Sequence, residues 1–275
     1  IANYPMIYHL IDTVKKLKPN SCRVIISDQM KLEKSLIKEK YNSLNFCIQK
    51  LQLGTADAVK SVKIKNNKKE DITLIVFADS PLIEFKTLNI LIKKIKNSKS
   101  DLILLSMIPE NPKNYGRIIL KNNNVQKIVE FSEASKSERE IRLCNSGIMV
   151  IKTNVLQENL LKIKNNNSKK EYYLTDLVEI LRSKNKSILH YECDFNQTLG
   201  VNDRQDLVRV DKLFQKRIRE KFLKKGITIL DPASTYFSYD TDIGKDSVIY
   251  PNVYFGLNVK IGRNVKIKSF SHIED

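Results

Sequence analysis

Short apolar runs alternate with helix-like patterns between residue 5 and about residue 196. Strands are predicted at residues 23–27, 45–49, 72–78, 101–108, 144–151 and 187–192, and helices at the apolar faces of residues 6–14 and 88–95. The run 74–77 is apolar on both faces, which is typical of a central strand in a parallel sheet. This alternation predicts right-handed βαβ units and an open, parallel, Rossmann-like α/β sheet. Residues 117–120 and 125–131 predict an added β-hairpin.

The pattern changes near residue 203. An amphipathic helix is predicted up to residue 225, with Leu207, Val210, Leu213, Phe214 and Ile218 on its apolar face, and Gly226 follows as a helix-ending glycine would. Bulky residues then recur every sixth position, at Ile243, Ile249, Phe255, Ile261, Ile267 and Ile273. Small or β-branched residues follow four positions later, at Ser247, Val253, Val259, Val265 and Ser271. This hexapeptide period predicts the start of a left-handed parallel β-helix; twisted antiparallel strands are the alternative.

The chain is strongly basic, with a formal net charge of +17 over 275 residues. Such a charge suggests nucleic-acid binding, but the lysines are scattered and few aromatic residues lie among them. We therefore attribute the charge to a composition rich in Lys, Asn and Ile, and expect no nucleic-acid partner. No apolar run approaches the roughly 20 residues that span a bilayer, and no signal-peptide pattern opens the chain. A cytoplasmic protein without membrane contact is expected.

The cysteines and two of the histidines suggest no binding or catalytic site of their own. The four cysteines form no C-x-x-C pair, so buried thiols in a reducing cytosol are expected rather than a zinc site. His9 and His190 are expected to pack or to face solvent.

Three loops follow predicted strand ends, where open α/β sheets bind ligands. In residues 49–58, Gly54 allows a close backbone approach, and Thr55 could cap a helix whose N-terminus suits an anion or a base edge. An ordinary strand–helix turn is the alternative. In residues 77–82, Asp79 at a strand tip could bind Mg²⁺, although a helix starting at Ser80-Pro81 would make this segment a cap. In residues 200–204, Asn202 offers a second oxygen ligand, with a turn and helix cap as the alternative.

Together these loops carry a resemblance. The ordered segments are LQLGT (51–55), ADSPL (78–82), YGR (115–117), IVE (128–130), NSG (145–147), EYYLTD (171–176) and GVNDR (200–204). With the hexads, the chain resembles over its whole length the bifunctional N-acetylglucosamine-1-phosphate uridyltransferase / glucosamine-1-phosphate N-acetyltransferase family. The resemblance implies uridylyl transfer from UTP to N-acetylglucosamine 1-phosphate, giving pyrophosphate and the peptidoglycan and lipopolysaccharide precursor UDP-N-acetylglucosamine. It implies a nucleotidyltransferase domain over residues 1–203, a linker helix over 204–225 and the start of an acetyltransferase β-helix over 226–275.

The resemblance also implies a site and a cofactor, Mg²⁺. Asp79 and Asn202 would be the catalytic, metal-binding pair. Nucleotide-binding residues would be Gln49, Gly54, Thr55, Phe77, Ala78 and Asp79, the first three at the uracil. Sugar-binding residues would be Gly116, Glu130 and Asn145, with Tyr172 and Thr175 shaping the pocket and Asn202 touching the product.

The chain departs from the family pattern at a few positions. Ala78 stands where many members have Gly, and Ser146 where Thr is commoner. The family's Gly-rich loop and basic phosphate clamp align before Ile1, and its acetyl-transfer residues align after Asp275, so His272 has no catalytic role. The resemblance therefore implies a fragment that is itself inactive, with acetyl-CoA use and a homotrimer belonging to the full-length parent. The alternatives are another hexapeptide-tailed sugar-phosphate nucleotidyltransferase, or a non-catalytic binding or trimerisation module.

Overall fold

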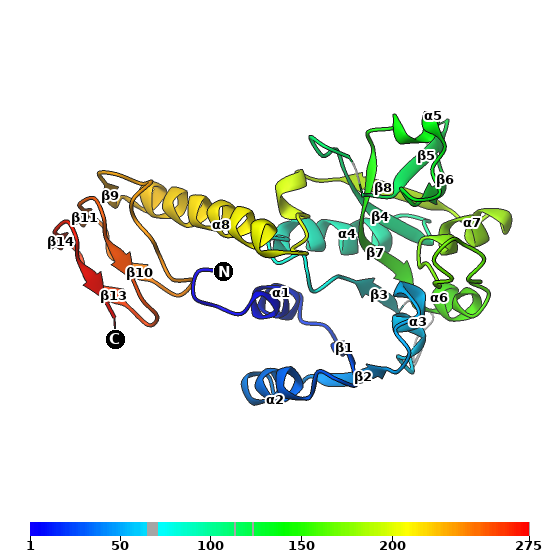
Figure 1. Ribbon diagram of the computed structural model, residues 1–275, viewed down its shortest axis with the longest axis horizontal. Helices are drawn as coiled ribbons and strands as arrows, with labels where there is room; N and C mark the ends of the chain where they lie inside the picture. Colours follow the sequence, from blue (N-terminus) through cyan, green and yellow to red (C-terminus); the bar gives the residue numbers. More distant parts are fainter. Residues whose placement is uncertain (65–70, 113, 123, 275) are drawn as a thin grey trace. The chain divides into compact units, whose positions relative to one another are not determined.

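A computed structural model describes residues 1–64, 71–112, 114–122 and 124–274 (Figure 1). The chain forms two compact units, each with its own apolar core. The larger unit comprises Thr13–Phe77 and Ile83–Thr198, and the smaller comprises Ile1–Asp12, Ala78–Leu82 and Leu199–Asp275. Among the described helices, none is both long and apolar enough to cross a membrane.

The larger unit is built on a six-stranded sheet. Its strands are β3 (Ile72–Ile75), β4 (Leu102–Met107), β5 (Arg117–Lys121), β6 (Asn124–Val129), β7 (Cys144–Lys152) and β8 (Ile188–Glu192). The order is β6-β5-β7-β4-β8, with β3 also paired to β7. The predicted hairpin forms from β5 and β6, and β4 runs parallel to β8, although three other strands lie between them in the chain. The sheet as a whole is mixed and not parallel as predicted, because β7 runs antiparallel to β3 and β4 and so needs no crossover helix.

The prediction of a central strand buried on both faces at residues 74–77 was wrong. β3 ends at Ile75, and all four of its residues are half-buried. Within the described residues β3 pairs only with β7, so it is an edge strand of this sheet. The strands β1 (Arg23–Ser27) and β2 (Asn45–Gln49) instead form a separate parallel pair connected by α2 (Lys31–Lys40), which is a βαβ unit of the predicted kind. An apolar run alone does not show whether a strand has one neighbour or two.

Helices supply the rest of this core. α4 (Phe85–Asn97) buries Leu88, Leu91 and Ile95, as its apolar spacing predicted. The core between sheet and helices includes residues of α3 (Thr55–Lys60), α6 (Thr153–Leu160) and α7 (Asp176–Ser183). Full burial of one such aliphatic side chain contributes about 1.5–3 kcal/mol. Two short elements complete the unit, α5 (Lys136–Arg139) and the 3-10 turn Phe195–Gln197.

The smaller unit is organised by α8 (Arg204–Lys225). The Asp203 carboxylate caps its start by accepting from the Asp206 amide at 2.8 Å, and Gly226 ends it with φ of 89°. Of the residues predicted on its apolar face, only Val210 is fully buried. The helix also buries Gln215 and Phe222, which were not predicted on that face. Gln215 exchanges two hydrogen bonds with the main chain of Phe237, so a buried amide joins the helix to the coil.

The hexads form a parallel coil, as predicted. Its strands are β9 (Thr228–Ile229), β10 (Asp242–Ile243), β11 (Val248–Ile249), β12 (Tyr254–Phe255), β13 (Lys260–Ile261), β14 (Lys266–Ile267) and β15 (His272–Ile273). Parallel pairing of β10 with β13, β11 with β14 and β12 with β15 stacks one turn on the next. Ile243, Ile249 and Phe255 are fully buried. Positive φ recurs at every sixth residue, at Asp246, Asn252, Asn258, Asn264 and Phe270, and Asn and Asp tolerate this conformation best.

The N-terminal segment belongs largely to the smaller unit. α1 (Met6–Lys15) starts there and buries Leu10 and Ile11. His9 packs against the rings of Tyr4, Phe214 and Tyr239 and contacts the Ile1 carbonyl, and burial lowers its pKa. All four cysteines are free thiols, and Cys144 is buried.

Candidate functional site

The loop after β2 is held against residues 171–173. The Tyr172 amide donates to the Leu53 carbonyl at 2.7 Å, and the Ala56 amide donates to the Tyr172 carbonyl at 2.9 Å. Gly54 has φ of +107°, and a β-carbon there would lie 2.7 Å from the Tyr172 oxygen. The close approach expected at Gly54 is therefore an approach of two segments of this chain, and no other residue type fits.

Thr55 does not cap the helix, contrary to the expectation from the sequence. Gly54 occupies the cap position, and Thr55 is the first residue of α3. The Thr55 Oγ1 instead accepts a hydrogen bond from the Leu174 amide at 2.9 Å. This contact joins the loop to the segment that leads into α7.

Gln49, the last residue of β2, lies beside this loop. Its Nε2 donates to the Gly54 carbonyl at 3.0 Å and to Asp57 Oδ2 at 2.8 Å. A cavity of about 320 Å³ lies here, lined by Gln49, Gln52, Gly54, Thr55, Ala58, Glu130, Glu171 and Tyr173. Residues expected at the uracil thus share a cavity with Glu130, which was expected at the sugar.

The expected sugar-binding residues also come together. Thr175 Oγ1 donates to Glu130 Oε1 at 2.8 Å. A β-carbon on Gly116 would lie 3.4 Å from Glu130 Oε2, so the absence of a side chain leaves that oxygen open. The Gly116 carbonyl accepts from the Asn145 amide at 2.8 Å. Gly116, Glu130, Asn145 and Thr175 therefore form one polar cluster.

Asn145 carries the clearest sign of a ligand. The residue is 8% exposed, and its Oδ1 is buried without a hydrogen bond from any described residue. A buried acceptor left without a donor costs about 1–3 kcal/mol, so a ligand N–H or O–H at this point would be favoured. Two residues further on, Gly147 has φ of +86°, and the Phe77 ring lies 2.9 Å from the position of its missing β-carbon. Phe77 therefore packs on the same strand, and the next residue, Ala78, is exposed.

The electrostatics near the Glu130 cluster are acidic. Burial, with the charges of Glu179 and Glu130, raises the pKa of Asp176 to about 6.

The two tyrosines of residues 171–176 differ in their surroundings. The Lys60 ammonium lies over the Tyr172 ring, with 3.9 Å from Nζ to the ring centre, and burial lowers the pKa of Lys60. Tyr173, which the sequence did not single out, lines the cavity, whereas Tyr172 is not among its lining residues.

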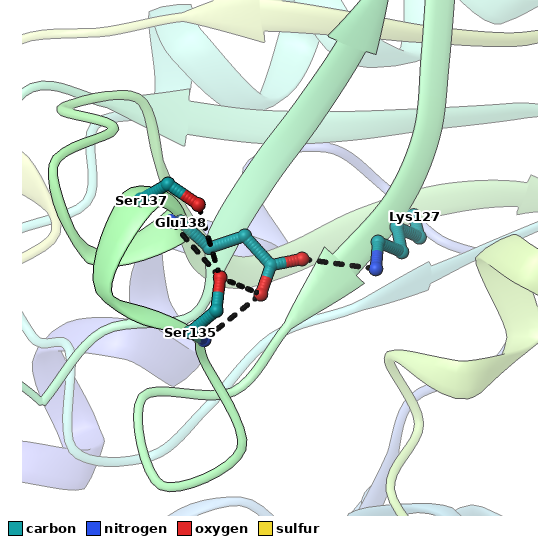
Figure 2. Close-up of polar contacts among 4 residues, drawn as sticks. All are labelled: Lys127, Ser135, Ser137 and Glu138. Carbon is teal, nitrogen blue, oxygen red and sulfur yellow. Dashed lines mark hydrogen bonds and ion pairs between the residues drawn. The ribbon is translucent and has the colours of Figure 1, made fainter.

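Two polar anchors hold the segments around Gly116 and Glu130. The buried Arg117 guanidinium donates to the carbonyls of Pro112 and Tyr115, and to that of Arg139 at the end of α5. Figure 2 shows the second anchor, at the start of α5. Ser135 and Glu138 form a reciprocal capping box, and Lys127 of β6 pairs with Glu138 at 3.0 Å. The Ser135 amide and Lys127 lower the pKa of Glu138 to about 2.

The predicted metal pair lies in the smaller unit. Asp79 Oδ2 and Asn202 Nδ2 lie 3.6 and 3.8 Å from the position that a β-carbon on Gly200 would take, so both side chains approach this glycine. The Val201 amide donates to the Asp79 carbonyl at 2.9 Å. Burial raises the pKa of Asp79, and the Ser80 hydroxyl donates to its Oδ1 at 3.1 Å. The helix start suggested for Ser80-Pro81 is not observed, because α4 begins at Phe85.

No group of three or more His, Cys, Asp or Glu that could bind a metal occurs among the described residues. A site here would use the Asp79 carboxylate and the Asn202 amide oxygen. The Asn202 amide nitrogen lies 3.4 Å from Asp206 Oδ2, to which it donates, so its Oδ1 is the remaining polar atom. Mg²⁺ suits such a pair because it takes few protein ligands and keeps waters or phosphate oxygens.

The sequence profile of the Nucleotidyl transferase family matches residues 1–247. The chain belongs to the nucleotidyl transferase family. A second profile, the bacterial transferase hexapeptide with six repeats, matches residues 240–275, which contain most of the coil.

This nucleotidyl transferase chain is also similar to curated relatives along its whole length. It is 37% identical over 275 residues to the bifunctional protein GlmU of Paramagnetospirillum magneticum and 38% identical over 278 residues to that of Bartonella bacilliformis. Each alignment covers 100% of this chain, but 60% and 61% of the relative. The chain thus spans about 60% of the length of these relatives. A solved Bacillus anthracis structure, described as a glucose-1-phosphate thymidylyltransferase, shares the fold, with a TM-score of 0.56 and 17% identity over 76% of this chain and 82% of that one.

Sequence reasoning missed three residues of this nucleotidyl transferase site. Asp57 contacts the Gln49 amide, Tyr173 lines the cavity and Arg117 anchors the segment at Gly116. Asp57 follows Gly54 by three residues, a spacing at which an acid often meets a loop amide. The other two had no signal beyond lying inside the motifs YGR and EYYLTD.

Proposed function

We propose that the whole protein transfers a uridylyl group from UTP to N-acetylglucosamine 1-phosphate, forming UDP-N-acetylglucosamine and pyrophosphate. The observation that carries the proposal is the cluster of Gly116, Glu130 and Asn145, in which a buried amide oxygen has no donor among the described residues. The cavity that Glu130 lines is also lined by Gln49, Gly54 and Thr55, which lie at and just after the end of β2, where nucleotide-binding sheets hold their ligands.

Each cluster has a chemical role in this proposal. Glu130 accepts hydrogen bonds from sugar hydroxyls, and Asn145 Oδ1 accepts from the acetamido N–H or a hydroxyl. Gln49, Gly54 and Thr55 hold the uracil, and Phe77, Ala78 and Asp79 line the nucleotide. Tyr172 and Thr175 shape the pocket, Tyr172 through its main chain and Thr175 through its bond to Glu130.

Asp79 and Asn202 would bind Mg²⁺. These two oxygen ligands suit Mg²⁺. Burial disfavours the charge of the Asp79 carboxylate, so a nearby cation would stabilise it, and the Asn202 oxygen is a hard ligand. When bound, the ion would neutralise phosphate charge. The chain's own residues bind and orient the substrates: Ser80 orients Asp79, and Asn202 also touches the product. Catalysis by positioning needs no protein nucleophile.

The division into domains and the wider setting belong to the same proposal. Residues 1–203 would form the nucleotidyltransferase domain, 204–225 the linker and 226–275 the start of the β-helix; the observed bounds of α8 support the middle one. In the full-length protein, the β-helix would acetylate glucosamine 1-phosphate with acetyl-CoA and assemble a homotrimer. The location would be cytoplasmic, and the product would serve peptidoglycan and lipopolysaccharide synthesis.

The proposal is tested by titration calorimetry with nucleotide sugars. We expect the 275-residue chain to bind UDP-N-acetylglucosamine more tightly than UDP-glucose, which lacks the acetamido group. Glu130→Gln should weaken the binding of UDP-N-acetylglucosamine while leaving the affinity for UTP nearly unchanged. Glu158→Gln is the matched control, because Glu158 is an exposed acid on α6 outside the cavity. Preference for ADP-glucose or GDP-mannose would assign another nucleotidyltransferase, and salt-dependent RNA binding without sugar-nucleotide binding would reject the proposal.

A further inference from the structure

The Asp57 side chain touches the proposed uracil site without belonging to it. Its Oδ2 lies 2.8 Å from Gln49 Nε2 and 3.3 Å from the Leu53 amide nitrogen, and it accepts from both. The Gly54 carbonyl accepts from the same Gln49 nitrogen at 3.0 Å. One amide nitrogen therefore has two oxygen acceptors, one from the main chain and one from a carboxylate.

These two acceptors decide which way the Gln49 amide points. A carbonyl and a carboxylate can only accept, so the atom that faces both must be the NH₂ group. Rotating the amide by half a turn would place its oxygen against two other oxygens. Both N–H groups are used in this arrangement, and Oε1 is the group that remains. No described residue donates to this oxygen, and Gln49 lines the cavity.

We propose that Asp57 is a positioning residue that fixes the Gln49 amide with Oε1 toward the base, and so selects a base that carries an N–H at position 3. The inference rests on the proposed function, because it requires the base of UTP to lie against Gln49. Uracil offers an N3–H donor to this oxygen. Cytosine has a lone pair at N3, so Oε1 meets another acceptor. A pocket built around a hydrogen bond discriminates against the analogue that cannot form it.

Asp57 also has a purely structural contact, the one to the Leu53 amide. If that contact were the only role of Asp57, removing the carboxylate would loosen the loop and weaken the binding of every nucleotide to the same extent. Control of the amide orientation instead changes the ratio of two nucleotide affinities. UTP and CTP are the right pair, because they differ only at positions 3 and 4 of the base.

The test measures dissociation constants of UTP and CTP for the 275-residue chain and three variants. The wild type should favour UTP. Asp57→Ala should reduce the ratio of Kd for CTP to Kd for UTP by about two- to twelvefold, the range for one neutral hydrogen bond. Asp57→Asn should keep most of the preference, because its amide oxygen can still accept from Gln49. Asp28→Ala, which removes an exposed carboxylate from another loop, should match the wild type. An unchanged ratio in Asp57→Ala would overturn the proposal.

A second readout needs no nucleotide. The Gln49 side-chain NH₂ signals in a ¹⁵N NMR spectrum can be identified by their loss in Gln49→Ala. In Asp57→Ala they should move, because one of the two acceptors is gone; signals that stay in place would overturn the orientation argument. If the wild type binds neither nucleotide, the proposed function and the base selection both fail, whereas the spectrum still decides whether Asp57 orients Gln49.

Discussion

At the residue scale, the hydrogen bond from Thr175 to Glu130 allows the sugar cluster to be perturbed without removing its carboxylate. Thr175→Val keeps the volume but removes the donor to Oε1. Thr175 precedes α7 without forming a side-chain cap, so the helix should not be affected. We expect affinity for UDP-N-acetylglucosamine to fall roughly fivefold, corresponding to about 1 kcal/mol, with UTP unchanged. Thr175→Ser should bind as the wild type does; equal binding by Thr175→Val would argue against this role for the hydroxyl.

Asp176 predicts a pH dependence of stability. Its pKa is raised from 3.8 to about 6, so the folded state holds a proton that the unfolded state has released between these values. The free energy of unfolding must therefore fall as pH rises through this window. The stability of Asp176→Asn relative to the wild type should therefore increase as the pH is raised from 4 to 7.5. The gain should be only about 1 kcal/mol, because the half-exposed group is screened and its charge favours the start of α7.

Urea unfolding at the two pH values measures this difference. Glu158→Gln serves as the control, because it removes one exposed acid from α6. A stability difference between Asp176→Asn and the wild type that stays constant, or shrinks as pH rises, would show that this carboxyl is not perturbed in the fold.

Individual residues were predictable where a motif required a particular chemistry. Gly54 was expected at a close approach, and its φ of +107° against Tyr172 requires one. Thr55 was expected to cap a helix, but its hydroxyl accepts from Leu174, far away along the chain. Asp57 had a local signal in its position three residues after Gly54, whereas Arg117 and Gln215 had none, because the fold alone brings the carbonyls of Arg139 and Phe237 near them.

At the scale of elements, α5 predicts a local change that does not require global unfolding. The Ser135 Oγ accepts from the Glu138 amide and so caps this short helix. Ser135→Ala should cost about 1 kcal/mol of local stability and speed hydrogen exchange at the Glu138 amide. Ser137→Ala is the comparison variant, because its hydroxyl contacts the Ser135 Oγ at 3.3 Å but caps no amide of this helix. Equal exchange rates in the two variants would show that the capping box does not hold α5.

Whole elements were easier to predict than their neighbours in the sheet. The period of six placed the coil interior correctly at Ile243, Ile249 and Phe255, because each position repeats the same environment. The strand at residues 74–77 was misjudged, because an apolar run shows that a strand is hydrophobic but not which strands flank it. The reversed direction of β7 was equally invisible in its sequence.

At the scale of the whole molecule, the coil predicts the assembly state. Each face described here stacks two or three short strands, and solenoids need about three repeats and a cap to be stable. We expect the 275-residue chain to show weak or no trimer formation. Light scattering at micromolar concentration checks this, and a tight trimer would mean that these few hexads suffice for assembly.

We propose that the loop after β2, the hairpin end at Glu130, the start of β7 and residues 171–175 form one site for a uridine sugar nucleotide. Hydrogen exchange of the 275-residue chain, measured with and without UDP-N-acetylglucosamine and Mg²⁺, tests it most directly. We expect slower exchange in all four of these segments, with little change in the hexapeptide coil. Binding that leaves them unchanged, or that protects only the coil, would contradict it.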